Sequence, residues 1–231
     1  MPDPLQRIDP PTTIRYPRNV KDDYYGGVSF QGAAGPVILA PLQLRPGVYE
    51  WINIELGNVV FEPGIYFIRS QHPLTGHALF ISALASVQAR GAMFYITPSA
   101  TYDANGSAFE TGDPPTPRSL GENIVPSAVI HMGLVASSLS GLNDSSSPYD
   151  GLLIYQDRAD RRPILIIQDS ATSNGTVGGV VYATSSHPLL TGYRDMQLSA
   201  VVGTMRMVNL LGLSLSPAKK LSAASDVYLV E

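Results

Sequence analysis

The residues that could do chemistry gather in one short stretch, YQDRADRRPILIIQD, at positions 155 to 169. Its ionisable members are Asp157, Arg158, Asp160, Arg161, Arg162 and Asp169. Paired carboxylates act as general acid and base in polysaccharide hydrolases, and polysaccharide lyases use similar acid–base chemistry. An arginine can bind an anionic sugar through two parallel hydrogen bonds. In this interpretation Asp157 or Asp160 is the acid or base, and a neighbouring arginine holds the substrate.

The same stretch also fits a purely structural role. Its charges alternate in sign within six residues, from Asp157 to Arg162, so they can pair with one another. Arginines in such a turn cover carbonyl and carboxylate groups between two strands, here GLLIY and PILII. We favour the structural interpretation and expect no catalytic residue. A carbohydrate-active enzyme, either a lyase or a hydrolase, stays the alternative.

A second candidate is a strip of aromatic side chains, Tyr49, Trp51 and Tyr66. If these rings point outward, they could stack on sugars or contact a partner protein. Stacking that only stabilises the fold is the alternative. The chain has no cysteine, its four histidines lie far apart, and it lacks the common nucleotide-binding and serine-hydrolase motifs. We therefore expect no metal site and no cofactor.

The elements that must position these residues are short strands. Runs rich in Val, Ile, Tyr and Phe are separated by Gly, Pro, Asn and Ser, which favours strands over helices. The motif PGVY returns as PGIY seventeen residues later. Seventeen residues at about 3.3 Å each give a contour of about 56 Å, which suits one coil of a parallel β-helix (solenoid). An antiparallel sandwich is the alternative fold.

Alternation within the strand GVYEWINIE predicts which side chains enter the coil. Val48, Ile52 and Ile54 fall on one face, so we expect Val48 above Ile65 inside the coil. The aromatic strip falls on the other face, with Tyr49 above Tyr66 outside. Glu50 interrupts the apolar face, and we place a bend there.

The chain of 231 residues is of a size that favours one domain. Residues 1–27 are rich in proline and predict an extended lead-in, and residues 28–231 hold the β domain. Residues 98–127 form a long polar loop insertion and residues 137–151 a shorter one. We expect both insertions to be mobile or decorative rather than binding sites.

Composition excludes several partners. The net charge is −4 and charged residues make up 15% of the chain, so there is no basic stripe for nucleic acid or an anionic membrane. No apolar run has the length of a transmembrane segment, and the chain as given shows no export signal. We expect no nucleic acid as partner and no membrane contact by this segment itself.

Several stretches occur in an order that suggests a family. They are DPLQRIDPPT, LRPGVYEWINIE, FEPGIYFI, GAMFYIT, SPYDGLLIYQDRADRRP, GGVVYA and VVGTMRMVNLLGLSLSP. From about residue 3 to the end, the chain resembles the C-terminal module of bacterial Tad (Flp-type) pilus-assembly proteins of the TadE/TadG-like group. The resemblance implies a right-handed parallel β-helix and a bacterial envelope or cell-surface location outside the cytoplasm.

The resemblance also implies a structural, adhesive or assembly role without catalytic residues. Expected partners are other envelope or pilus proteins, or surface glycans. It further implies that YQDRADRRP is a shared corner element, in agreement with the structural interpretation. A self-assembling filament subunit stays a further alternative, because the open end of a solenoid presents unpaired strand edges.

Overall fold

The computed structural model describes residues 5, 8–11, 24–31, 40–97, 125–133, 136–169, 175–193, 195–209 and 215–217. Within these residues the chain contains strands and no helix, so the prediction of an all-β chain is confirmed for this part. Accordingly, no helix found there is long and apolar enough to span a membrane. The strands are β1 (Tyr24–Gln31), β2 (Leu42–Leu44), β3 (Gly47–Phe61), β4 (Gly64–Ile68), β5 (Leu79–Ile81), β6 (Ala85–Arg90), β7 (Ala92–Ile96), β8 (Ala128–Met132), β9 (Ser138–Ser140), β10 (Leu152–Gln156), β11 (Ile164–Gln168), β12 (Thr176–Ala183), β13 (Leu189–Gly192), β14 (Gln197–Val202) and β15 (Arg206–Asn209).

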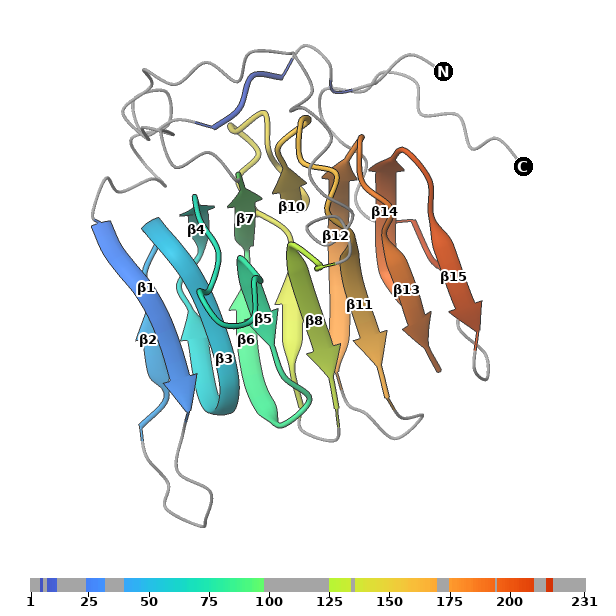
Figure 1. Cartoon of the computed structure of the whole chain (residues 1–231). Coiled ribbons are helices and arrows are strands. Elements are labelled where there is room, and N and C mark those ends of the chain that lie inside the picture. Colours follow the sequence, from blue (N-terminus) through green and yellow to red (C-terminus); the bar gives the residue numbers. More distant parts are fainter. Residues whose placement is uncertain are drawn as a thin grey trace.

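The described strands pair in parallel and form three rows, which we call the first, second and third faces (Figure 1). The first face stacks β3, β4, β7, β10, β12 and β14. The second face stacks β1, β3, β5, β8, β11, β13 and β15. The third face stacks β2, β3, β6, β9 and β12. The chain therefore visits the faces repeatedly in the same order, and the prediction of parallel strands is confirmed.

Strand β3 shows how the chain turns from one face to the next. Its first residues pair with β4, its middle with β5 and its last part with β6. The first change of partner falls between Tyr49 and Ile52, so the predicted bend at Glu50 lies at this corner. On the third face Leu42 pairs with Val59, seventeen residues further on, whereas Gly47 on the first face pairs with Tyr66, nineteen further on.

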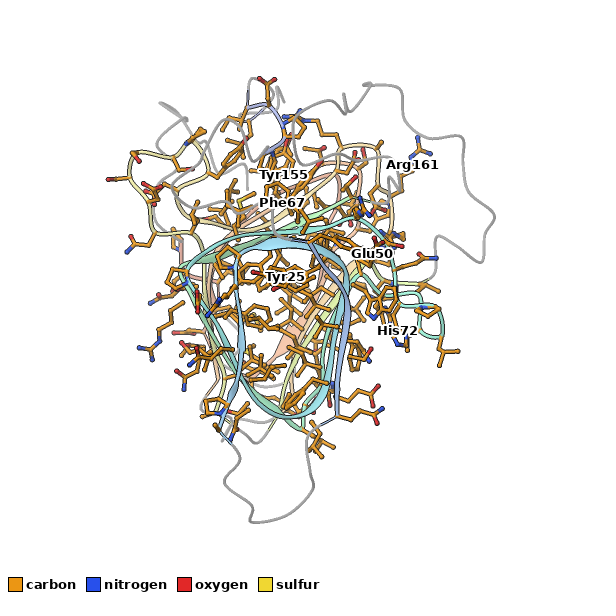
Figure 2. The ribbon with its side chains drawn as sticks, turned by 90° about the vertical axis from the view of Figure 1, so that its left-hand side faces the viewer. Tyr25, Glu50, Phe67, His72, Tyr155 and Arg161 are labelled. Carbon is orange, nitrogen blue, oxygen red and sulfur yellow. The ribbon has the colours of Figure 1, made fainter. Side chains whose placement is uncertain are left out.

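An apolar interior lies between the three faces, and one row of aromatic rings runs through it. We call this row the inner stack: Tyr25, Tyr49, Tyr66 and Phe94, with successive ring centroids 5.0, 5.8 and 5.6 Å apart. Figure 2 places Tyr25 inside the ribbon. Tyr49 and Tyr66 are 1% and 0% exposed. The prediction that these two rings point outward is therefore wrong.

The two side chains expected inside the coil beside these rings, Val48 and Ile65, do not enter the apolar interior. Val48 and Ile65 belong to a second apolar cluster, separate from the interior that holds Ile52 and Ile54. The reason is the bend: the alternation on either side of Glu50 is out of phase, because turning the corner takes an extra residue. A single phase for the whole strand GVYEWINIE was the incorrect assumption.

The second apolar cluster lies on the outer side of the first face. Its centre is a row of paired residues on neighbouring strands, which we call the outer row: Phe67, Tyr95, Tyr155 and Tyr182. All four are buried. Figure 2 shows Phe67 and Tyr155 outside the ribbon that encloses Tyr25. Leu5 and Ile8 belong to the same cluster, so part of the predicted lead-in packs on this face.

The structure describes one of the two predicted loop insertions completely and leaves most of the other outside the described residues. Residues 98–124 of the long insertion lie outside the described residues, as does most of the lead-in, although β1 begins inside it at Tyr24. The shorter insertion, residues 137–151, is not decorative. It contains β9 and contributes the buried side chains of Leu142 and Tyr149 to the second apolar cluster.

Candidate functional site

The charged stretch predicted to carry chemistry forms the corner between β10 on the first face and β11 on the second. The amide of Asp157 continues the strand ladder by donating to the carbonyl of Ile96 at 2.8 Å. The amide of Asp160 then donates to the carbonyl of Asp157 at 2.9 Å, which closes a tight turn. Pro163 follows immediately before β11. The corner is thus defined by backbone bonds as well as by its charges.

The carboxylate of Asp157 is buried and engaged on both oxygens. It is 5% exposed. Oδ1 accepts a hydrogen bond from the amide of Ala159 at 2.7 Å, and Oδ2 accepts one from the hydroxyl of Thr97 at 3.1 Å. Asp157 therefore caps its own turn and ties it to the end of β7.

The carboxylate of Asp160 forms a buried ion pair with Arg162. The Nη2 of Arg162 lies 2.7 Å from Oδ2, and its Nε lies 3.0 and 3.1 Å from the two oxygens. The amide of Arg162 also donates to Oδ1 at 3.0 Å. Arg162 Nη1 donates to Gln71 at 3.2 Å, and Gln156 donates to the carbonyls of Asp160 and Arg162. Because both charges are buried, this pair depends on these hydrogen bonds to offset desolvation.

Arg158 leaves the corner and covers the outer row. Its Nε donates to the hydroxyl of Tyr182 at 2.6 Å, and its guanidinium carbon lies 5.4 Å from that ring's centroid. Its Nη2 donates to the carbonyls of Leu5 and Ile8 at 2.8 and 2.9 Å. The arginine that was a candidate for binding a sugar thus binds backbone carbonyls of the chain's own N-terminal segment.

The remaining charged residues do not converge on the corner. Arg161 is exposed and lies at the periphery of the molecule in Figure 2. Asp169 follows β11 and contacts Nε2 of His131 at 2.6 Å on the second face. Acid–base chemistry requires a carboxyl group that can reach the bond it cleaves. Neither Asp157 nor Asp160 has that freedom, so this arrangement serves the fold.

The aromatic strip predicted from Tyr49, Trp51 and Tyr66 does not exist as a surface, because both tyrosines are interior. Trp51 is half-buried at the corner between the first and second faces. Its indole covers Gly27 of β1, where an added Cβ would lie 2.1 Å from the ring. Its Nε1 donates to the hydroxyl of Ser29 at 3.3 Å, and its ring meets the ring of His72 edge-on at 5.7 Å. Trp51 therefore attaches β1 to β3.

A polar cluster beside Trp51 was not found from the sequence. Glu50 accepts hydrogen bonds from the Tyr24 hydroxyl at 2.7 Å and from Arg69 at 2.8 and 2.9 Å. The Arg69 guanidinium also lies 5.0 Å from the centroid of the Tyr24 ring. Partial burial acts to raise the pKa of Glu50, but the hydrogen bonds from Tyr24 and Arg69 outweigh it and hold the pKa below its ordinary value. The residue that interrupted the strand pattern is an ion-paired corner residue.

A groove of about 650 Å³ follows the corner between the third and first faces. Glycines form much of its wall because the strands turn there, and its polar side chains include Arg90, Asn143 and Gln197. No sequence motif indicated this groove. Among the residues that the structure describes, no group of three His, Cys, Asp or Glu is placed to hold a metal ion.

The residues that sequence reasoning missed are those of the outer row and its cover. The hydroxyl of Tyr149 donates to the carbonyl of Asp9 at 2.5 Å, across 140 positions of sequence. Single-sequence patterns carry no signal for such a contact.

The resemblance to Tad pilus modules stays a prediction: no family model, curated protein or solved structure matches this chain.

Proposed function

We propose that the chain is a right-handed parallel β-helix that serves as a noncatalytic structural module of a pilus-associated or cell-surface protein. The β-helix is supported by parallel rows of strands on three faces around a shared apolar interior. An antiparallel sandwich requires antiparallel ladders, and the described ladders are parallel. Stacked coils of this kind form a rigid rod, in which each coil contacts mainly its neighbours.

The observation that carries the noncatalytic role is the state of the corner carboxylates. Asp160 is held by Arg162 with both side chains buried, and Asp157 is held by Thr97 and its own turn. A polysaccharide-degrading site needs an acid and a base that face a bound sugar. Here the two candidate carboxylates stabilise a corner, and the neighbouring Arg158 holds the N-terminal segment.

The partners proposed for this module are other envelope or pilus proteins, or surface glycans, at an extracytoplasmic location. The glycine-lined groove supports a glycan partner, because it runs past the corners before β4, β7 and β10 and is lined by few polar side chains. Ligand sites are concave and carry a small number of polar groups, backbone N–H and C=O among them, that fix the orientation of the ligand.

The end of the molecule at β1 favours a second function, a self-assembling filament subunit. Tyr25 belongs to the inner stack yet is 37% exposed, and its neighbour Tyr24 is exposed as well. Because the ring of Tyr25 lies at the end of the inner stack and is partly exposed, the end of a second copy of the chain could pack against it. Sedimentation over a range of concentrations tests this function: assemblies that grow with concentration and disappear in Tyr25→Lys support it, and a monomer throughout contradicts it.

A depolymerisation assay tests the noncatalytic role. The purified chain is incubated with acidic and neutral polysaccharides, while reducing ends and the absorbance of unsaturated uronides are followed. Asp157→Asn and Asp160→Asn are the test variants, and Asp169→Asn is the matched control because its carboxylate lies outside the corner. We expect no turnover by any form. Turnover that is lost in either test variant and kept in the control would overturn the proposal.

A further inference from the structure

The N-terminal segment occupies a built site on the outer side of the first face. We call Leu5 together with residues 8–11 the strap, and the outer row with Tyr149 and Arg158 the cradle. In Figure 1 residues 8–11 of the strap, in dark blue, lie above the upper ends of β7 and β10. Strap and cradle are far apart in sequence, and their contacts combine apolar packing with hydrogen bonds.

Apolar packing is provided by two side chains of the strap. Leu5 is 0% exposed and Ile8 is 7% exposed, and both belong to the cluster formed by the cradle. The amide of Ile8 donates to the carbonyl of Leu5 at 2.9 Å, so the two residues are held in one turn. This turn presents both side chains to the aromatic rings of the outer row.

Polar recognition is directed at the backbone of the strap. Arg158 donates to the carbonyls of Leu5 and Ile8. The hydroxyl of Tyr149 donates to the carbonyl of Asp9, and the hydroxyl of Tyr155 lies 3.4 Å from the carbonyl oxygen of Ile8. Three carbonyls of the strap, those of Leu5, Ile8 and Asp9, thus accept hydrogen bonds from cradle side chains. Arg158 is itself positioned by the hydroxyl of Tyr182.

Such contacts are typical of a peptide-binding site. Bonds to backbone carbonyls and pockets for two apolar side chains recognise a segment without requiring that it be joined to the same domain. Between Pro11 and Tyr24 the chain has twelve residues, which span at most about 40 Å when extended. A connection with this maximum length can join the strap of one copy to the cradle of another.

We propose that the cradle is a peptide-docking site and that the strap of a second copy of this chain can occupy it. Reciprocal exchange of two straps gives a closed dimer in which each cradle is filled by the partner. The strap of the same molecule competes at an effective concentration in the millimolar range. Exchange is therefore favoured at high protein concentration or wherever copies are held together. This inference does not depend on the proposed function.

A peptide-binding experiment tests the cradle. The full-length chain with Leu5→Asp and Ile8→Asp, which we call the strap variant, is titrated into a fluorescent peptide of residues 1–11. We expect the strap variant to bind at least tenfold more tightly than the unchanged chain, whose own strap competes. Adding Arg158→Ala to the strap variant should weaken binding at least tenfold. A peptide with Asp at positions 5 and 8 is the control and should not bind.

A mixing experiment tests exchange between copies. The strap variant keeps an intact cradle, and the Arg158→Ala chain keeps an intact strap. We expect each to sediment as a monomer alone and an equimolar mixture to contain a heterodimer. Tyr149→Phe replaces Arg158→Ala if the latter unfolds, and Ile8→Asp alone replaces the strap variant. Circular dichroism verifies that each variant is folded. Failure of the peptide to bind a folded strap variant, or absence of the heterodimer at concentrations where the peptide binds, would overturn the proposal.

Discussion

The inner stack and the outer row are two rows of aromatic residues that share strands β4 and β7, where the two rings are neighbours in sequence. On β4 the inner ring is Tyr66 and the outer ring is Phe67; on β7 they are Phe94 and Tyr95. Tyr49, Tyr66 and Phe94 of the inner stack are buried between the three faces, whereas Tyr25 is partly exposed. All four rings of the outer row are buried, and the strap packs over them.

The two rows differ in where their hydroxyl groups bond. The hydroxyl of Tyr66 donates to the carbonyls of Leu44 and Glu62, and that of Tyr49 to the carbonyl of Arg45. These acceptors belong to the adjoining corners of the same coils. On the outer side, Tyr155 and Tyr182 bond instead to the strap and to the arginine that holds it. Tyrosine hydroxyls thus bond to corner carbonyls on the inner side, and on the outer side they bond to the strap and to Arg158.

The largest expected effect comes from truncating the inner stack. Tyr66→Ala removes a buried ring and the hydrogen bonds of its hydroxyl to the carbonyls of Leu44 and Glu62, so we expect the free energy of unfolding to fall by about 3–5 kcal/mol. Tyr182→Ala is the matched outer variant. Its loss should be smaller, because the strap can settle into the space. Urea denaturation measures the free energy of unfolding of both variants. An equal decrease in Tyr66→Ala and Tyr182→Ala would contradict the distinction between the two rows.

Removing the guanidinium that joins strap and cradle comes next. Arg158→Ala loses charged hydrogen bonds to two carbonyls and to the Tyr182 hydroxyl, for which we expect about 1.5–3 kcal/mol in urea denaturation. Arg161→Ala is the control because Arg161 is exposed, and its stability should change little. A similar loss in both variants would show that general charge, and not the strap contact, is responsible.

Alkaline pH should weaken the inner stack. Burial raises the pKa of Tyr49 and Tyr66 above the unfolded value, about 10, so the folded chain binds their protons more tightly. Stability from this source is complete below about pH 10 and falls as the pH rises further, by about 1.4 kcal/mol per phenol at pH 11. Urea midpoints between pH 8 and 11 measure the decline. Tyr66→Phe should make it shallower; an unchanged slope would contradict burial of that hydroxyl.

The smallest expected effect comes from one hydroxyl of the cradle. Tyr149→Phe keeps the ring and deletes the hydrogen bond to the Asp9 carbonyl, which predicts a loss of about 0.5–1.5 kcal/mol. Tyr193→Phe, at a half-buried tyrosine after β13, serves as the control. Thermal unfolding by circular dichroism measures the difference. A Tyr149→Phe chain as stable as the unchanged one would mean that this bond contributes nothing to holding the strap.

Sequence patterns predicted the strands and their parallel arrangement, since both depend on local propensity and on a repeated turn. The structural interpretation of the corner also agrees with the contacts of Asp160 and Arg162, because residues so close in sequence can pair in one turn. The direction of Tyr49 and Tyr66 was predicted wrongly. Alternation holds along a straight strand and changes phase where the strand bends, as it does at Glu50.

The cover of the outer row could not be predicted. Leu5 and Ile8 lie in a proline-rich stretch whose composition indicates an extended lead-in, and no local pattern links them to Arg158 or Tyr149. Contacts across about 150 residues follow from the parallel rows of strands, which bring distant corners together. The hydrogen bonds from Arg158 to the carbonyls of Leu5 and Ile8 are likewise visible only in the three-dimensional structure.

Hydrogen exchange measured by mass spectrometry tests most directly the claim that the coil and the strap are held separately. In the unchanged chain, we predict that the amide of Ile8, which donates to the carbonyl of Leu5, exchanges faster than those of β4, β7 and β10. In Arg158→Ala, exchange of the Ile8 amide should accelerate at least tenfold while β4 and β7 keep their protection. If the strands lose protection together with Ile8, the strap is an inseparable part of the strand rows and the account is contradicted.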